Sequence, residues 1–298
     1  MSALLLGTYD LHSPEWYAVR DMRLGGSEIA AVLGLSKWES AFGLWHRKRG
    51  EIPDQAENRE MRWGTKLESL ICDEFAACHP EFQSDRAGTY VAEDRPWQLA
   101  NPDRILYPES YPDHEAAPVA LVEAKTARFD DEWGTEGTDE IPPYYLAQCR
   151  WYLDVFDLDV CHVPVLIAGS DYREYVVRQD AADVTLMREK AEAFIVSLRN
   201  GQRPPIDGHT ETYQTVMRLP EGVTDEEVDL DPELAREFIA AQHAYKAAET
   251  EKRRTCALVL DAIGSGKHAR FAGERLASRA VKKDGTTHSL KPAKGIAA

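Results

Sequence analysis

Two carboxylates and one lysine stand where a β-sheet could bring them together. Asp103 lies at the expected end of one strand, and Glu123-Ala124-Lys125 lies twenty residues later in the next. Side chains alternate along a strand, so Glu123 and Lys125 share one face while Ala124 points away. Carboxylate oxygens suit Mg²⁺ or Mn²⁺, and a lysine can orient or deprotonate water beside such an ion. This set predicts hydrolysis of a phosphodiester, although an ordinary cross-strand ion pair has the same spacing.

Four further residues could complete such a site. Glu68 lies at the border of the apolar stripe of a long amphipathic helix, and Gln148 lies in the first turns of a later helix. Arg20 precedes Ser27 by seven residues, and we expect Ser27 to be the N-cap of a short helix. A guanidinium and a hydroxyl beside free helical N–H groups form a phosphate cradle. Each residue also has an ordinary structural interpretation as a cap, a surface ion pair, a solvated glutamate or a packed amide.

Hydrophobic periodicity predicts the elements that must position these residues. Helical spacing covers 27–34, 40–49, 57–78, 143–156, 181–198 and 232–263. Short β-prone runs cover 88–91, 97–100, 119–125, 160–167 and 172–178, and we expect the first three to form one antiparallel meander. A small β-ribbon is expected about Asp284-Gly285. This order predicts the α/β (α+β) fold class, with a central mixed β-sheet flanked by helices.

Composition excludes several classes of protein. The chain has 298 residues, 43% of them hydrophobic, and no apolar run approaches the roughly 18 residues that a membrane span needs. The N-terminus lacks the basic start of a signal peptide, so we expect a cytoplasmic protein. Its five cysteines contain no C-x-x-C pair, which disfavours a disulfide framework and an iron–sulfur or zinc site. The tryptophans at 16, 45, 63 and 151 are expected in the core rather than as stacking platforms for bases.

The charge distribution divides the chain. The net charge is −16, yet the last 47 residues hold 11 Lys and Arg against 3 Asp and Glu. We expect a catalytic core at 1–208, an acidic linker at 209–230, and a long helix with a basic tail at 231–298. Any binding of DNA would then depend on local patches of Lys and Arg. One candidate patch is the tail, and another comprises Arg20, Arg23, Lys37, Arg47, Lys48 and Arg49.

The candidate residues lie within longer motifs that occur in a fixed order. These motifs are Trp16-Tyr17-Ala18-Val19-Arg20, Gly25-Gly26-Ser27, Trp63-Gly64-Thr65-Lys66-Leu67-Glu68, Asn101-Pro102-Asp103, Glu123-Ala124-Lys125 and Gln148-Cys149-Arg150-Trp151-Tyr152. As a set they resemble the YqaJ-type viral recombinases, relatives of lambda exonuclease in the PD-(D/E)xK nuclease superfamily, and the resemblance implies that superfamily's core fold.

The resemblance also implies a role for each residue. Asp103 and Glu123 would bind two Mg²⁺ ions, for which Mn²⁺ could substitute, together with the backbone carbonyl of Ala124. Lys125 would activate the water and Glu68 would complete the site. Gln148 would position the scissile strand or the nucleophile. Arg20 and Ser27 would hold the 5′ phosphate of a DNA end.

The function implied is a 5′-to-3′ exonuclease acting on linear duplex DNA in phage recombination, within a bacterial host. It would hand its single strand to an annealing protein, and related enzymes suggest a ring-shaped trimer. The long helix leaves a different assembly open. Two alternatives remain from the residues: a structure-specific or Cas4-like endonuclease, and a DNA-end-binding protein without catalysis.

Overall fold

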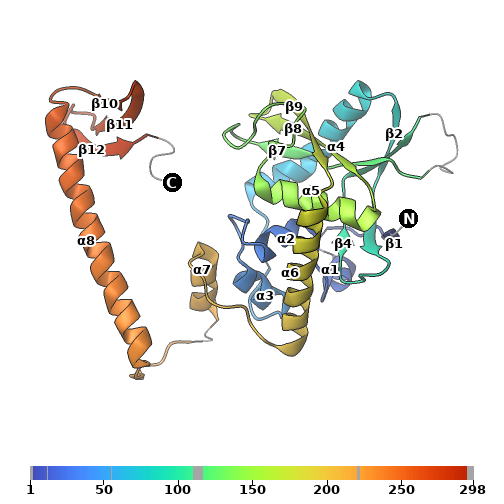
Figure 1. Cartoon of the computed structure of the whole chain (residues 1–298), viewed down its shortest axis with the longest axis horizontal. Helices are drawn as coiled ribbons and strands as arrows, with labels where there is room; N and C mark the ends of the chain where they lie inside the picture. Colours follow the sequence, from blue (N-terminus) through green and yellow to red (C-terminus); the bar gives the residue numbers. More distant parts are fainter. Residues whose placement is uncertain (1–2, 12, 55, 110–116, 220–221, 294–298) are drawn as a thin grey trace. The chain divides into compact units, whose positions relative to one another are not determined.

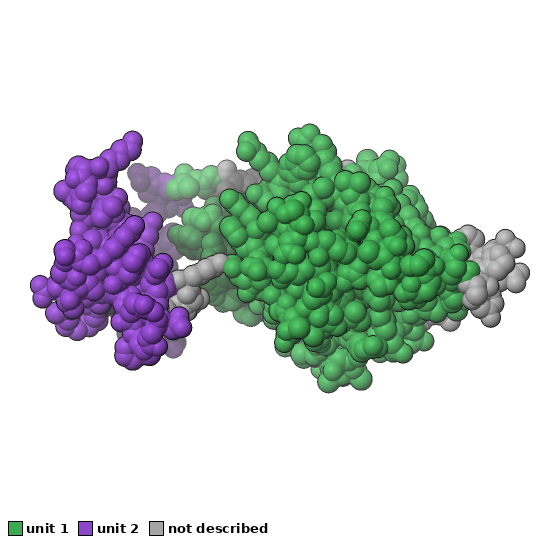
Figure 2. Space-filling model, turned by 90° about the horizontal axis from the view of Figure 1, so that it is seen from above, with its two compact units in different colours: residues 1–223 green, residues 224–298 purple. Residues whose placement is uncertain are grey.

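The chain folds into two compact units in a computed structural model that describes residues 3–11, 13–54, 56–109, 117–219 and 222–293 (Figure 1). The first unit comprises Met1–Val223 and the second comprises Thr224–Ala298. Figure 2 colours the two units separately. Each unit is described below by itself.

The first unit contains seven helices and nine strands among the described residues. The helices are α1 (Pro14–Arg20), α2 (Gly26–Val32), α3 (Ala41–Lys48), α4 (Arg59–Cys78), α5 (Pro143–Phe156), α6 (Ala181–Asn200) and α7 (Thr210–Arg218). The strands are β1 (Ala3–Gly7), β2 (Phe82–Arg86), β3 (Thr89–Ala92), β4 (Leu99–Ala100), β5 (Arg104–Pro108), β6 (Ala120–Val122), β7 (Lys125–Ala127), β8 (Val160–Ile167) and β9 (Asp171–Arg178).

A six-stranded mixed sheet forms the centre of this unit. Strand β5 pairs antiparallel with β2 on one side and with β6 on the other, and β6 pairs with β8 in parallel. Strand β7 also pairs with β8 in parallel, and β9 is the antiparallel neighbour of β8. The register is the same for both parallel pairs, because Leu121 lies opposite Cys161 and Lys125 lies opposite Val165. Strands β6 and β7 are therefore the two halves of one strand that is interrupted at 123–124.

Helices cover both faces of the central sheet. Alternation along β6 directs Ala120 and Val122 to one face, where they pack with Phe75 of α4. Leu121 points to the opposite face and joins the larger core cluster, which includes Trp151 and Leu153 of α5. The predicted fold class, a mixed sheet flanked by helices, is confirmed. The interrupted strand thus lies between α4 and α5.

The predicted three-stranded meander is wrong. Strand β3 pairs with β1 on one side and with β4 on the other in a separate small sheet, whereas β6 belongs to the central sheet. Strand β5, which the sequence analysis missed, intervenes between them and begins directly after Asp103. Asp103 therefore precedes a strand instead of ending one. The missed strands β1, β2 and β5 are only five residues long, and such runs carry a weak pattern.

The predicted helices are found within a few residues, but two expectations about their surroundings need correction. The stripe of α4 buries Ile71 and Phe75, whereas Trp63 and Leu70 are about 60% exposed. Of the four tryptophans assigned to the core, Trp45 and Trp151 are buried.

Helix α7 occupies part of the segment 209–230 that was assigned to a linker. Its buried Thr212 donates a hydrogen bond to Ser40.

The second unit consists of one long helix and a small sheet. Helix α8 (Pro232–Ala262) has no buried residue. It precedes a three-stranded antiparallel sheet formed by β10 (His268–Phe271), β11 (Glu274–Val281) and β12 (Thr287–Pro292). The turn between β11 and β12 contains the predicted Asp284-Gly285, while β10 was not predicted. Within the described residues, no helix is long and apolar enough to span a membrane.

Candidate active site

Asp103 lies directly before β5, beside the interruption between β6 and β7. Its backbone N–H donates to the carbonyl of Val122 at 3.0 Å, which continues the pairing of β5 with β6. Its side chain then accepts a hydrogen bond from the N–H of Ala124, with 2.7 Å between Oδ2 and N. The backbone N–H of Ala124 is therefore bonded to a carboxylate and not to a neighbouring strand. This hydrogen bond fixes the carboxylate of Asp103 beside the interrupted strand.

Glu123 is buried directly after β6, and one of its carboxylate oxygens accepts hydrogen bonds from two side chains. Its Oε1 accepts from Nζ of Lys125 at 2.5 Å and from Nε2 of Gln148 at 2.6 Å. The same Gln148 amide lies 3.0 Å from the hydroxyl of Tyr152. The second oxygen, Oε2, is buried and has no hydrogen-bond partner among the described residues. Since a buried carboxylate oxygen normally has a partner, this atom marks a place for a ligand.

Burial and mutual repulsion shift the pKa values of these groups. Burial raises the pKa of Asp103 well above its ordinary value, and the carboxylates of Glu123 and Glu68 raise it further. Burial also raises the pKa of Glu123, against the opposing effect of Lys125. Burial would lower the pKa of Lys125, but Glu123, Tyr145 and Asp103 outweigh it and the pKa rises. A divalent cation would relieve the repulsion between the carboxylates.

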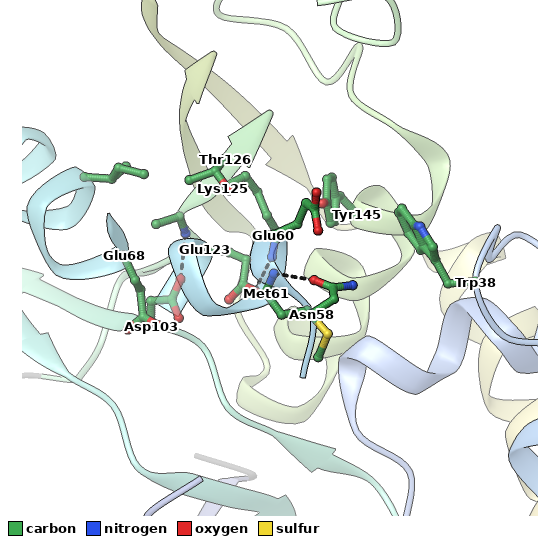
Figure 3. Close-up of a pocket in the computed structure, with 13 residues that line it drawn as sticks. Trp38, Asn58, Glu60, Met61, Glu68, Asp103, Glu123, Lys125, Thr126 and Tyr145 are labelled. Carbon is green, nitrogen blue, oxygen red and sulfur yellow. Dashed lines mark hydrogen bonds and ion pairs between the residues drawn. The ribbon is translucent and has the colours of Figure 1, made fainter. Parts of the chain in front are cut away.

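These side chains line a pocket of about 700 Å³ (Figure 3). Glu68 of α4 lies beside Asp103 at one end of the view, and Trp38 stands at the other end. Among the described residues, no three His, Cys, Asp or Glu side chains form a metal-binding group by themselves. The structure therefore brings together five of the predicted residues, namely Asp103, Glu123, Lys125, Glu68 and Gln148. They come from three elements (α4, β7 and α5), the interruption at 123–124 and the segment before β5.

Arg20 and Ser27 line a second pocket of about 590 Å³, which shares Met61 with the first. The prediction that Ser27 is the N-cap is wrong, because Gly25 occupies that position and Ser27 is the second residue of α2. Gly25 lacks a side chain, and a Cβ there would lie 2.6 Å from Nη2 of Arg20. Glycine at this position therefore leaves space for the guanidinium beside the helix N-terminus.

Glu28 is a residue of this second pocket that the sequence analysis missed. It is buried, and it accepts from the N–H of Gly25 at 2.9 Å. Three cations surround it, with N to O distances of 3.2 Å for Arg20, 3.3 Å for Arg47 and 3.0 Å for Lys48. Burial would raise the pKa of Glu28, but these cations hold it well below its ordinary value. The glutamate three residues after Gly25 was the available sequence signal, because it completes a capping box.

The predicted basic patch on the core is largely neutralised. Arg20, Arg47 and Lys48 pair with Glu28, and Arg47 pairs also with Glu39 and Asp54. Lys37 forms an ion pair with Glu132, and Arg49 forms one with Glu51. Arg23 donates to the carbonyls of Val19 and Pro96. These cations hold the local structure together instead of presenting a free positive surface.

Comparison with known proteins confirms the predicted family. Residues 15–159 match the YqaJ-like viral recombinase domain. The chain is 27% identical over 205 residues to the uncharacterized protein YqaJ of Bacillus subtilis (strain 168), and the match covers 67% of this chain and 60% of that protein. The predicted resemblance to the YqaJ-like viral recombinases is therefore confirmed for residues 15–159. All of the predicted site residues lie within the matched segment.

Two solved structures that match part of the chain are named exonucleases. An alkaline exonuclease from Laribacter hongkongensis, LHK-Exo, matches with 16% identity and a TM-score of 0.49 over 70% of this chain and 100% of its own. A phage-related exonuclease from Haemophilus somnus 129PT matches with 11% identity and a TM-score of 0.43 over 62% of this chain and 97% of its own.

Proposed function

We propose that this chain is a metal-dependent deoxyribonuclease that degrades linear duplex DNA from its 5′ end. The observation that carries the proposal is the convergence of the buried carboxylate of Glu123, the half-buried carboxylate of Asp103 and the ammonium of Lys125 at an interrupted strand. Asp103 is fixed by the Ala124 N–H, and Glu123 is held by Lys125 and Gln148. The family match covers this segment, and the relatives of similar arrangement that are named exonucleases agree with the assignment.

The donor set suits Mg²⁺. Asp103, Glu123, the carbonyl of Ala124 and Glu68 would hold the ion, and the partnerless Oε2 of Glu123 provides a free oxygen. Mg²⁺ usually binds one or two carboxylates and completes its shell with water and substrate phosphate. Asp103 and Glu123 supply two such carboxylates, and Glu68 lines the same pocket, so the set fits this ion. When bound, Mg²⁺ supplies Lewis acidity toward the scissile phosphate.

The chain's own side chains orient the reaction. Lys125 carries its proton, since its pKa is raised, so it donates hydrogen bonds toward the nucleophile and the phosphate. Gln148 holds Glu123 in place, and Tyr152 supports Gln148 from within the core. Arg20 would hold a 5′ phosphate through the donors that its contact with Glu28 leaves available, with Ser27 beside it. An anchored end places the next phosphodiester at a fixed distance from the carboxylates.

Digestion of labelled DNA tests this proposal. Linear duplex, labelled at either end and with or without a 5′ phosphate, is incubated with Mg²⁺ or with EDTA. We expect mononucleotides from the phosphorylated 5′ end, no product in EDTA, and a loss of roughly 100-fold or more in Lys125→Ala. Lys190→Ala removes an exposed lysine of α6 as a control and should digest normally.

Other outcomes would contradict the proposal. Cleavage of closed circular DNA would assign a structure-specific or Cas4-like endonuclease. Binding of DNA ends without metal-dependent cleavage would assign an end-binding protein. The annealing partner, a ring-shaped trimer and a cytoplasmic location in a phage-infected host remain predictions.

A further inference from the structure

The small sheet of the second unit carries exposed cations that form no ion pair within the described residues. Arg270, Arg275, Lys282, Lys283 and Lys291 are all exposed, and we call these five residues the tail patch. Among the described residues, none of the five forms an ion pair with a carboxylate. By contrast, Arg253 and Arg254 of α8 pair with Glu249 and Glu251. The tail patch therefore keeps its positive charge available, unlike the paired cations near Arg20.

Two of these cations lie directly opposite each other. Arg270 of β10 pairs across the strands with Arg275 of β11. Like charges at opposed positions destabilise a sheet unless an anion lies between or above them. Arg270 also donates to the carbonyl of Gly273, which fixes it at the turn. The fold thus places two arginines at opposed strand positions, and neither forms an ion pair with a carboxylate in the described part of the chain.

One face of the sheet is available for a ligand. Ala269 and Ala277 face each other across β10 and β11 and are buried. Arg279, two residues along from Ala277, donates to the carbonyls of Leu260 and Gly264 at the end of α8. This face is therefore turned toward the helix. The opposite face carries the row His268, Ser278 and Lys291 across the three strands, with both outer members exposed.

An exposed aromatic residue follows Arg270 at the end of β10. Phe271 is 74% exposed at the end of β10, next to Arg270 in sequence and opposite Glu274. Lys282 and Lys283 follow the other end of β11, so the cations extend over about 25 Å of strand. A cationic track with an exposed ring matches single-stranded nucleic acid, whose phosphates and unstacked bases each find a partner. A paired duplex offers no free base face except at its ends.

We propose that the tail patch and Phe271 bind single-stranded DNA outside the catalytic unit. The inference deepens the proposed function and rests on it for the source of the strand, since removal of one strand from a duplex leaves the other unpaired. The surface lies beyond residues 15–159, so the family match does not include it. Bound there, the single strand would keep the enzyme on its substrate between cleavage events.

Binding to a closed circle of single-stranded DNA tests the inference, because a circle offers no 5′ end to the core. The full chain with Lys125→Ala is titrated in EDTA with a fluorescent circle. Arg270→Gln with Arg275→Gln should weaken binding about tenfold or more and lower the slope of log K against log salt by about 1.4. Phe271→Ala should weaken binding about fivefold and leave that slope unchanged. Arg236→Gln with Lys246→Gln removes the same charge from exposed positions of α8 and should bind normally.

Three results would overturn the inference. They are equal affinity in the tail-patch variant, an equal loss in the α8 control, and a preference for a duplex circle. Circular dichroism of each variant confirms that it remains folded. Since the assay needs neither metal nor a DNA end, its outcome is independent of the digestion assay. Normal digestion with unchanged circle binding rejects only this inference, and circle binding without digestion rejects only the proposed nuclease.

Discussion

Glu28 shows how one buried residue organises the proposed phosphate pocket. Its carboxylate contacts three cations from α1 and α3, and the side chains of Glu28 and Lys48 are both about 5% exposed. A buried charge of this kind is stabilising only while its partners are present. Arg20 also lies over the ring of Trp16 at 4.7 Å, so its position is fixed on two sides. Contacts within the chain therefore fix the side chain of Arg20 in the proposed cradle.

Replacement of Glu28 tests this role at the residue scale. Glu28→Gln keeps an acceptor for the Gly25 N–H but leaves the cations uncompensated, so we expect a loss of about 3–5 kcal/mol in the free energy of unfolding. Urea denaturation measures it. Glu39→Gln removes a partner of Arg47 that is less buried and should lose much less. Equal losses in both variants would contradict a special role for Glu28.

The pH dependence of that difference has a defined sign. The folded-state pKa of Glu28 is depressed below 4.5, so its stabilisation is present above pH 4.5 and is lost as pH falls through the folded value. The gap between the wild type and Glu28→Gln should therefore be constant from about pH 6 to 8 and shrink below about pH 4.5. Urea titrations at each pH measure this gap. A gap that widens on acidification would contradict the assignment.

Gln148 offers a second test at the residue scale. Its amide is the donor that holds Glu123 from the α5 side. Gln148→Leu should lower the rate of DNA digestion about 10- to 100-fold, because groups that orient metal ligands have effects of this size. Tyr152→Phe keeps the bond from Gln148 to Glu123 and should have a smaller effect. The rates are measured at saturating DNA. A larger loss in Tyr152→Phe would show that packing, not the amide, is decisive.

The contact of α2 with α5 connects the two pockets at the element scale. A Cβ on Gly26 would lie 2.4 Å from Cε1 of Tyr152, so only glycine allows this approach. Tyr152 contacts Gln148, whereas α2 carries Ser27 and Glu28. The close approach thus sets the distance between the phosphate cradle and the carboxylates.

Gly26→Ala should be destabilising by about 1–3 kcal/mol, since it overpacks a buried ring. Gly208→Ala is the matched control, because a Cβ at Gly208 meets no atom within 4 Å. The two variants are compared by the denaturant concentration at the midpoint of unfolding, with the slope m of the free energy of unfolding against denaturant unchanged. A Gly26→Ala protein as stable as the control would mean that α2 and α5 separate easily.

Periodicity revealed the long elements of this fold, and tertiary interactions decided the rest. Helix α5 and strand β8 have the predicted bounds because each has a long, regular apolar pattern. Strand β4 has only two residues, and its pairing with β3 depends on the separate small sheet. The proposed catalytic set was found because its residues lie close in sequence or within motifs. Ion pairs such as Lys37 with Glu132 join residues 95 positions apart, so the neutralisation of the basic patch could not be predicted.

At the scale of the whole molecule, the two units differ in the size of their cores. Both large hydrophobic clusters lie within the first unit, whereas the buried apolar residues described in the second are Ala269 and Ala277. Burial of apolar surface is the main source of stability. The first unit should therefore fold without the second, which has little core of its own.

Truncation after Val223 tests this division together with the proposed roles. The fragment 1–223 should unfold cooperatively at nearly the same denaturant concentration as the full chain, because it keeps both clusters. It should still digest linear duplex in Mg²⁺, since the candidate active site lies entirely within it. With Lys125→Ala added, its affinity for the single-stranded circle should fall at least as far as in the tail-patch variant. A fragment that is unfolded would show that α8 or the small sheet stabilises the core, whereas a folded fragment with full circle affinity would place strand binding in the catalytic unit.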